Sequence, residues 1–182
     1  MRELILGGQK SGKSRAAEDR ARAWLQEPGH QAVLLATAKA GDDEMVARIE
    51  RHRLDRAQRV PALRAVEASG DLVQALMAQG AADTLIVIDC LTLWLTQRLM
   101  PLHGPAAPDL AAQTDALLMA LAAAPGPVVL VSNEIALGVV PMDAATRRFV
   151  DTLGLLHQRV AVACERVSLI VAGCEWALKG QR

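Results

Sequence analysis

A phosphate-binding loop pattern near the start of the chain restricts what the chain can fold into. Residues 7–14 read Gly-Gly-Gln-Lys-Ser-Gly-Lys-Ser and match G-x-x-x-x-G-K-S. The pattern requires a strand before it and a helix after it. An apolar run at 4–6 precedes the loop, and alanines at helical spacing follow Ser14. These features predict a strand–loop–helix unit that binds a nucleoside triphosphate.

The chemistry of such a loop explains its residue types. Glycines allow a tight turn whose backbone N–H groups surround an anion, and the following helix adds its positive N-terminal end. Lys13 is expected to reach the β- and γ-phosphates and act in catalysis, and the Ser14 hydroxyl to bind Mg²⁺. The nucleotide-binding residues predicted from the loop are Gly7, Gly8, Gln9, Lys10, Ser11, Gly12, Lys13 and Ser14. The alternative, a glycine-rich turn that binds nothing, is disfavoured because spacing, strand and helix agree.

Length and composition indicate one domain over residues 1–182 with an aliphatic core. Hydrophobic residues make up 52% of the chain but aromatic residues only 2%. Twenty basic and twenty acidic side chains leave no net charge. This balance argues against a general binder of nucleic acid or of anionic membranes.

The cysteines and the apolar segments bear on the cellular compartment. Cys90, Cys164 and Cys174 lack C-x-x-C spacing, so neither a disulfide framework nor a zinc site is expected. The chain enters the first strand directly, without a signal-peptide pattern. The apolar stretch 85–95 is too short to span a bilayer and contains Asp89. We therefore expect a soluble, cytoplasmic protein with reduced thiols.

Apolar runs and helical patterns alternate along the chain. Strands are expected at 4–6, 32–36, 60–66, 85–89, 127–132 and 167–172, and helices after 14, from 41 to about 54, and at 71–77, 91–99, 110–124 and 144–165. Between them lie a loop at 101–108 and an irregular segment at 133–143. This order predicts an α/β domain of the P-loop NTPase (RecA-like) type, with a mostly parallel sheet covered on both faces. Ligands of such sheets bind beyond the strand carboxyl ends, where we expect Thr37, Glu67, Asp89 and Ser132 to Glu134 to meet.

Asp89 follows four apolar strand formers and has the form of a Walker-B acid. A charge at the end of a buried strand is costly without a partner, and Mg²⁺ shared with Ser14 would supply one. The alternative is that Asp89 caps the helix beginning near Leu91. The two roles are compatible.

His52 stands on a strongly basic predicted helix with Arg48, Arg51, Arg53 and Arg56. The generic interpretation is a solvated charged face. The arginines would also attract a triphosphate and favour the neutral imidazole, which is a nucleophile. A histidine nucleophile divides a difficult group transfer into two in-line steps.

Several motifs in a fixed order carry a family resemblance. Besides residues 7–14 they are Ala36-Thr37-Ala38, D-D-E-M-x-x-R-I-x-x-H-R at 42–53, Asp89-Cys90-Leu91-Thr92, and S-N-E-x-x-x-G-x-V-P at 132–141. Together they resemble the bifunctional adenosylcobinamide kinase / adenosylcobinamide-phosphate guanylyltransferase family, over essentially the whole chain. Ala136, the His157-Gln158 pair and the tail 173–176 depart from the family pattern.

The resemblance implies two reactions. ATP or GTP phosphorylates adenosylcobinamide; GTP then loses pyrophosphate to form a GMP–histidine at His52, and the phosphorylated corrinoid takes the GMP. Further nucleotide contacts are implied for Ala36, Thr37, Ala38, Arg53, Leu54, Asp55, Arg56, Glu67 and Asp89. The resemblance also implies a Mg²⁺ ion, bound by Ser14 and Asp89, and a homotrimer.

Two other functions compete with this hypothesis. One is a single-function P-loop kinase for a small molecule, with His52 as surface charge. The other is a non-catalytic nucleotide-dependent switch in which residues 133–143 move. No partner motif in the sequence supports the switch.

Overall fold

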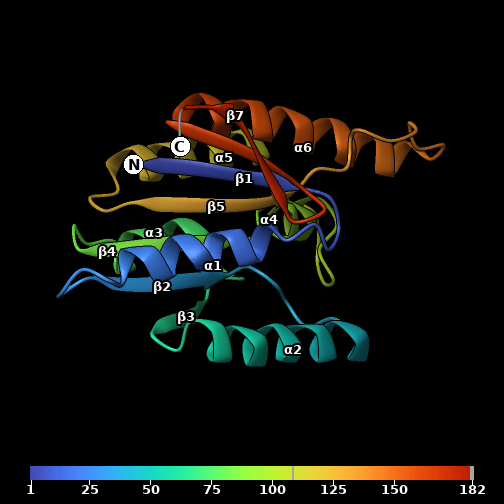
Figure 1. The fold of residues 1–182 in the computed structure, drawn as a ribbon. Helices are drawn as coiled ribbons and strands as arrows, with labels where there is room; N and C mark the ends of the chain where they lie inside the picture. Colours follow the sequence, from blue (N-terminus) through green and yellow to red (C-terminus); the bar gives the residue numbers. More distant parts are fainter. Residues whose placement is uncertain (108, 181–182) are drawn as a thin grey trace.

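A seven-stranded sheet forms the centre of the protein. The computed structural model describes residues 1–107 and 109–180. The strands are ordered β3-β2-β4-β5-β1-β6-β7 across the sheet (Figure 1). All neighbours pair in parallel except β6 and β7, which are antiparallel. Their bounds are β1 Arg2–Gly7, β2 Gln31–Ala36, β3 Leu63–Glu67, β4 Thr84–Asp89, β5 Val128–Asn133, β6 Arg166–Val171 and β7 Cys174–Lys179.

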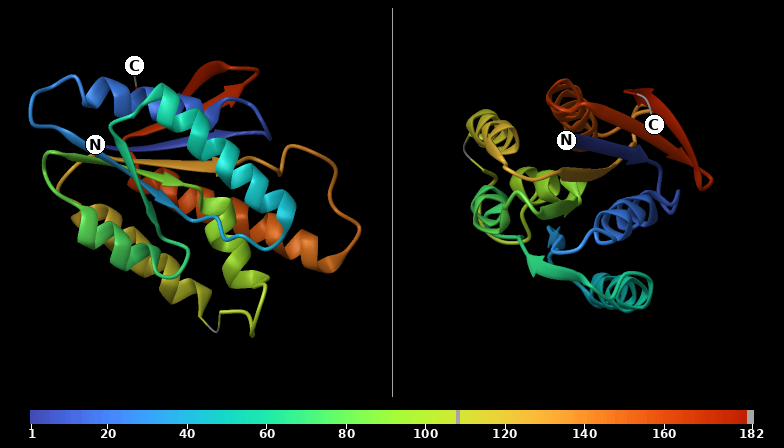
Figure 2. Two further views of the ribbon diagram at one scale, coloured as in Figure 1. Left: turned by 90° about the horizontal axis from the view of Figure 1, so that it is seen from below. Right: turned by 60° about the vertical axis from the view of Figure 1, so that its left-hand side comes forward.

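Helices connect the parallel strands and cover both faces of the sheet. They are α1 Lys13–Trp24, α2 Asp43–Arg59, α3 Leu72–Gln79, α4 Leu91–Leu99, α5 Leu110–Ala123 and α6 Ala144–Ala163. Helices α1 and α2 lie on one face, and α3 to α6 lie on the other (Figures 1 and 2). The predicted α/β fold with a mostly parallel sheet is confirmed.

The core consists of two aliphatic layers, one on each face of the sheet. The central strands β1, β4 and β5 are buried over most of their length, as strands covered on both faces should be. Leu4, Ile86 and Leu130 face the layer beneath α3 to α6. Ile5 and Val129 face the layer beneath α1. Burial of these side chains is the main favourable contribution to folding.

Helix α2 stands apart from this core, below the β2–β3 edge in Figure 1. Asp42 caps its N-terminus by accepting a hydrogen bond from Met45 N at 2.7 Å. The helix includes Arg56, as predicted, and ends at Arg59. None of its residues is buried. Near its C-terminal end an ion pair between Arg59 Nε and Glu18 Oε2, 3.0 Å apart, holds it to α1.

The hairpin of β6 and β7 was not predicted, because the tail after Ala172 shows no long apolar run. Ala172 and Gly173 turn the chain with φ values of 52° and 79°. Arg20 of α1 then bridges Glu3 of β1 and Glu175 of β7, at 2.9 and 2.5 Å. A partly buried charged network therefore holds β7 at the edge of the sheet.

Two further predictions concern loops and membranes. Residues 101–107 contain neither helix nor strand, as expected, and Pro108 lies outside the described residues. Among the helices of the described chain, none combines the length and apolarity needed to cross a bilayer.

Candidate nucleotide site

The phosphate loop connects the end of β1 to the start of α1. Gly12 takes a φ of 106°, which favours glycine, and Lys10 takes a φ of 56°. A Cβ on Gly7 would lie 2.5 Å from Ser11 Oγ and 2.6 Å from the Ile170 carbonyl oxygen, so only glycine fits there. The loop is held from outside by Gly173 N, which donates to Ser11 O at 2.9 Å. The sequence motif thus has its expected strand–loop–helix geometry.

Lys13 begins α1 and folds back over the loop. Its side chain is almost fully buried, and Nζ donates to the Gly8 carbonyl at 2.7 Å. Burial lowers the pKa of Lys13, whereas the charges of Cys90 and Asp89 raise it. Within the described chain Lys13 belongs to none of the ion pairs, and a bound phosphate would supply a direct one.

Asp89 ends β4, two strands from β1 in the sheet, and meets the phosphate loop. Burial raises the pKa of its carboxyl group, while His52, Arg56, a hydrogen bond from Ser14 and Lys13 lower it. Cys90, not Asp89, occupies the N-cap position of α4, so the alternative role of Asp89 as a cap is wrong.

The oxygen atoms of Ser14 and Asp89 fit a Mg²⁺ ion that is also bound by substrate phosphate. Mg²⁺ prefers oxygen ligands and commonly takes one or two from protein and the rest from phosphates and water. In the described part of the chain, no group of three or more His, Cys, Asp or Glu side chains could enclose a metal by itself. The donor set therefore suits a nucleotide-bound Mg²⁺.

Thr37 is buried behind this carboxylate. Its Oγ1 donates to Cys90 O at 2.7 Å and accepts from Cys90 N at 2.8 Å. Because both hydrogen bonds go to the backbone, the hydroxyl of Thr37 positions the end of β4. A nucleotide contact by Thr37 stays a prediction.

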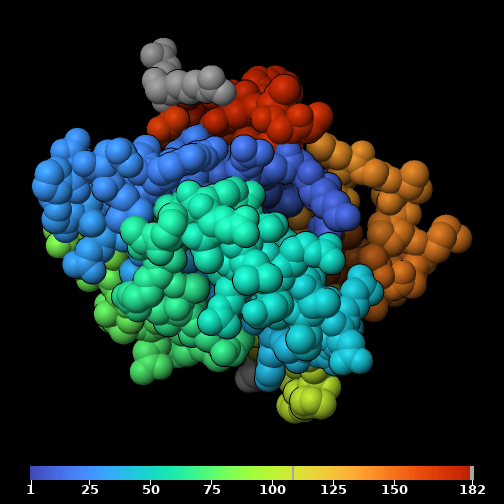
Figure 3. Space-filling model, turned by 60° about the horizontal axis from the view of Figure 1, so that its bottom comes forward, coloured from blue at the N-terminus to red at the C-terminus, as the bar shows by residue number. Residues whose placement is uncertain are grey.

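A small cavity, the central hollow, brings the predicted chemical groups together. It has a volume of about 170 Å³ and is lined by Lys13, Ser14, Ala36, Ala38, His52, Arg56, Asp89 and Asn133, among others. His52 enters from α2, on the same helical face as Met45, Ile49 and Arg56. Helix α2 crosses this side of the molecule in Figure 3, where it is coloured cyan to green. The histidine and the phosphate loop thus share one cavity.

Two larger hollows adjoin the central one. The outer hollow, of about 610 Å³, runs along residues 9–15 of the phosphate loop and is also lined by His52 and Asp55. The arginine hollow, of about 560 Å³, lies between α2 and β3 and is lined by Ala36, Ala38, Arg53, Arg56 and Glu67. Leu54 lies outside these hollows on an exposed face of α2. Apart from Leu54, the predicted α2 residues and Glu67 therefore lie in hollows that contain the phosphate loop or adjoin the central hollow.

A buried polar network beside the site was not predicted from the sequence. Ser132 Oγ lies 2.7 Å from His157 Nε2 and 3.0 Å from Thr92 Oγ1. Thr92 Oγ1 also accepts a hydrogen bond from Asn133 N at 2.8 Å, and Asn133 lines the central hollow. His157 lies on the apolar stripe of α6 between Leu153 and Val160, and this position is the signal that could have identified it as buried.

Fold and site together define a P-loop α/β protein that adds a histidine-bearing basic helix to the phosphate loop. The chain belongs to the cobinamide kinase / cobinamide phosphate guanyltransferase family, whose model matches residues 3–178. The family and the kinase and nucleotidyltransferase class predicted from the sequence are thereby confirmed.

Curated relatives agree with this membership. The chain is 45% identical to the bifunctional adenosylcobalamin biosynthesis protein CobP of Pseudomonas aeruginosa, over 100% of this chain and 99% of that protein. It is 34% identical to the CobU protein of Escherichia coli, over 93% of this chain and 95% of that one.

A solved structure supports the fold alone. The flagellar accessory protein FlaH of Methanocaldococcus jannaschii superimposes with a TM-score of 0.52 at 11% identity, covering 99% of this chain and 78% of that one.

Proposed function

We propose that this chain phosphorylates cobinamide and then transfers GMP to the product through a covalent intermediate on His52. The observation that carries the proposal is that His52 lines the same hollow as Lys13, Ser14 and Asp89. Family membership supports the two reaction types. The covalent step is our inference from the placement of the imidazole.

In the first reaction the acceptor hydroxyl attacks the γ-phosphorus of ATP or GTP, the nucleoside diphosphate leaves, and the hydroxyl proton is released to solvent. Lys13 and the backbone N–H groups of the loop hold the phosphates where charge develops. A Mg²⁺ ion bound by Ser14 and Asp89 would neutralise part of that charge.

In the second reaction an imidazole nitrogen of His52 attacks the α-phosphorus of GTP. The bond to the β-phosphate oxygen breaks and pyrophosphate leaves, with Lys13 stabilising its charge. A phosphate oxygen of cobinamide phosphate then attacks the same phosphorus and displaces the imidazole. The product carries the GMP, and His52 is regenerated.

The arginine hollow is the expected position of the base. Glu67 offers a carboxylate, which can accept hydrogen bonds from the two adjacent N–H donors of guanine. Glu67 Oε1 accepts a hydrogen bond from Ser69 Oγ at 2.6 Å, which orients the carboxylate and leaves both oxygens able to accept further hydrogen bonds. Arg53 and Arg56 line the same hollow, where a guanidinium can bind a phosphate group or stack on the face of the base.

Labelling with GTP carrying isotope at the α-phosphate tests the covalent step. The wild type should retain acid-labile, base-stable label without any acceptor, and His52→Ala should retain none. His30→Ala is the matched control, because His30 stacks on Trp24, 3.8 Å between ring centroids, and lines none of the hollows described above. Equal labelling of wild type and His52→Ala would refute the role of His52.

A single-function kinase remains the second candidate, because His52 is exposed on a helix without buried residues. Under this alternative only the γ-phosphate is transferred, and GTP alone releases no pyrophosphate. A pyrophosphate assay on the same samples separates the two functions.

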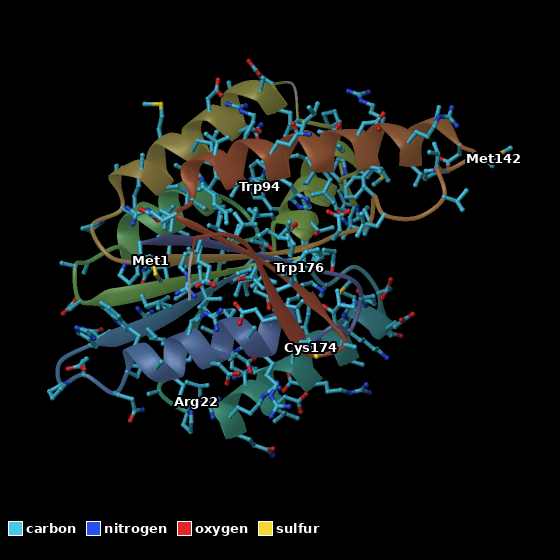
Figure 4. All side chains as sticks on the ribbon, turned by 45° about the horizontal axis from the view of Figure 1, so that its top comes forward. Met1, Arg22, Trp94, Met142, Cys174 and Trp176 are labelled. Carbon is cyan, nitrogen blue, oxygen red and sulfur yellow. The ribbon has the colours of Figure 1, made fainter. Side chains whose placement is uncertain are left out.

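We also infer self-association into a homotrimer. The segment after β5 exposes Leu137, Val139, Val140 and Met142, which are 82%, 97%, 70% and 95% accessible. Met142 lies at the far end of this projecting loop (Figure 4). A run of exposed apolar side chains of this kind is typical of an interaction surface. Analytical ultracentrifugation should give three times the 19.4 kDa chain mass, and Val139→Asp should shift the mass toward the monomer.

A further inference from the structure

A further cavity, the loop hollow, opens at the same edge of the sheet. It has a volume of about 370 Å³ and lies between the start of α2, helix α4 and residues 100–107. It shares Met45 and Leu93 with the central hollow. A ligand in the loop hollow can therefore extend past these two side chains toward the phosphate loop.

The outer wall of the loop hollow is held in place by specific contacts. Ala107 N donates to Arg98 O at 2.7 Å, which ties the end of the loop to α4. Leu102 packs so closely on Gly41 that a Cβ there would lie 2.8 Å from Leu102 Cδ1. The loop and the segment before α2 thus meet and close one side of the cavity.

Arg98 supplies a charged hydrogen-bond donor to this cavity, which is also lined by Lys39. Its guanidinium lies 4.6 Å from the ring centroid of the buried Trp94, and Nε donates to Gln113 Oε1 at 3.1 Å. Its remaining contacts, to the carbonyls of Trp94 and Gly70, are long at 3.4 Å. Within the described chain it belongs to none of the ion pairs. Asp71 acts on Arg98 only as a nearby charge, which raises the pKa of the guanidinium against the effect of burial. A half-buried guanidinium whose hydrogen-bond partners are all neutral has donor capacity left for a ligand.

The character of the cavity differs from that of the arginine hollow. The loop hollow combines Arg98 with apolar walls from Leu93 and Leu102, whereas the arginine hollow offers Glu67 with two arginines. A base with paired N–H donors fits the arginine hollow. A ligand with carbonyl acceptors on an aliphatic frame fits the loop hollow.

Resting on the proposed function, we propose that the loop hollow binds the hydroxyl-bearing arm of the cobinamide acceptor. Arg98 donates to amide carbonyls of the corrinoid, and the aliphatic part of the arm lies against Leu93 and Leu102. The hydroxyl then passes between Met45 and Leu93 into the central hollow. The cavity has room for an arm but not for the macrocycle, which would rest on its rim.

Equilibrium dialysis with cobinamide, detected by its visible absorbance, tests this site without requiring turnover. Arg98→Met keeps the aliphatic stem over Trp94 and removes the donors. Arg64→Met is the matched control, because Arg64 also donates to a glutamine, Gln79 Oε1 at 2.5 Å, but on the exposed surface of β3. Each protein is also labelled with α-labelled GTP in the absence of acceptor, and its thermal midpoint is recorded.

We expect Arg98→Met to bind cobinamide at least tenfold more weakly, with GTP labelling and the Arg64→Met control unchanged. Wild-type affinity in Arg98→Met overturns the proposal, as does a wild type that does not bind cobinamide. Equal loss of GTP labelling and cobinamide binding in a folded Arg98→Met overturns it too, since the hollow would then serve the nucleotide. Wild-type labelling by GTP decides separately whether the covalent step of the proposed function holds.

Discussion

The imidazole of His157 and the hydroxyl of Ser132 lie 2.7 Å apart, Nε2 to Oγ, inside the protein. Ser132 is fully buried and His157 is 7% exposed, so water does not replace this contact when it is lost. The pair joins α6 to the end of β5. Through Thr92 it continues to Asn133 at the wall of the central hollow.

Replacing His157 by Phe should destabilise the protein by about 1–3 kcal/mol, because Ser132 loses a hydrogen-bond partner in the core. Urea unfolding measures this change. His103→Phe, in the exposed loop 101–107, should stay within about 0.5 kcal/mol of wild type. If both variants unfold at the same urea concentration as wild type, the buried pair contributes nothing to stability.

The stability contribution of His157 should depend on pH. Burial lowers the pKa of His157, and the nearby Glu134, 3.8 Å from Nδ1, raises it. The unfolded chain therefore takes up this proton at a higher pH than the folded protein. The contribution is complete above about pH 6.5, the ordinary histidine value, and is lost as the pH falls below it. Unfolding free energies of wild type and His157→Phe should accordingly converge between pH 7 and pH 5; a constant difference would contradict this.

Asp89→Asn should lower both activities without lowering the stability of the protein. Burial raises the pKa of Asp89, so the folded protein holds this proton more tightly than the unfolded chain, and ionisation at neutral pH costs stability. The neutral amide avoids that cost, and we expect an equal or higher thermal midpoint without Mg²⁺. The same variant should lose at least a hundredfold in both activities, because the carboxylate no longer holds the ion. A less stable variant with normal activity would refute the assignment.

The elements that could be predicted from the sequence are those that local sequence patterns determine. The glycines of the phosphate loop predict a tight turn, and the apolar run before Asp89 predicts a buried strand that ends there. The tail after Ala172 was missed because β7 depends on long-range pairing with β6 and on the network of Arg20, not on its own hydrophobicity. The absence of buried residues from α2 could not be predicted either. Its face with Met45, Ile49 and His52 has helical spacing, but periodicity does not say how closely a face packs.

Two adjacent glycines in the phosphate loop provide the last prediction. A Cβ at Gly7 meets Ser11 Oγ at 2.5 Å and the Ile170 carbonyl at 2.6 Å, whereas a Cβ at Gly8 meets nothing within 4 Å. Ser11 could rotate, but the backbone of β6 is fixed by its pairing with β1. Gly7→Ala must therefore displace the loop, and we expect at least tenfold weaker binding of GTP, measured by isothermal titration calorimetry. Gly8→Ala should bind GTP within about twofold of wild type, unless the nucleotide itself approaches the Gly8 Cα closely. Normal GTP binding by Gly7→Ala would mean that the loop tolerates displacement from β6, and that its close fit against Ile170 has no part in holding phosphate.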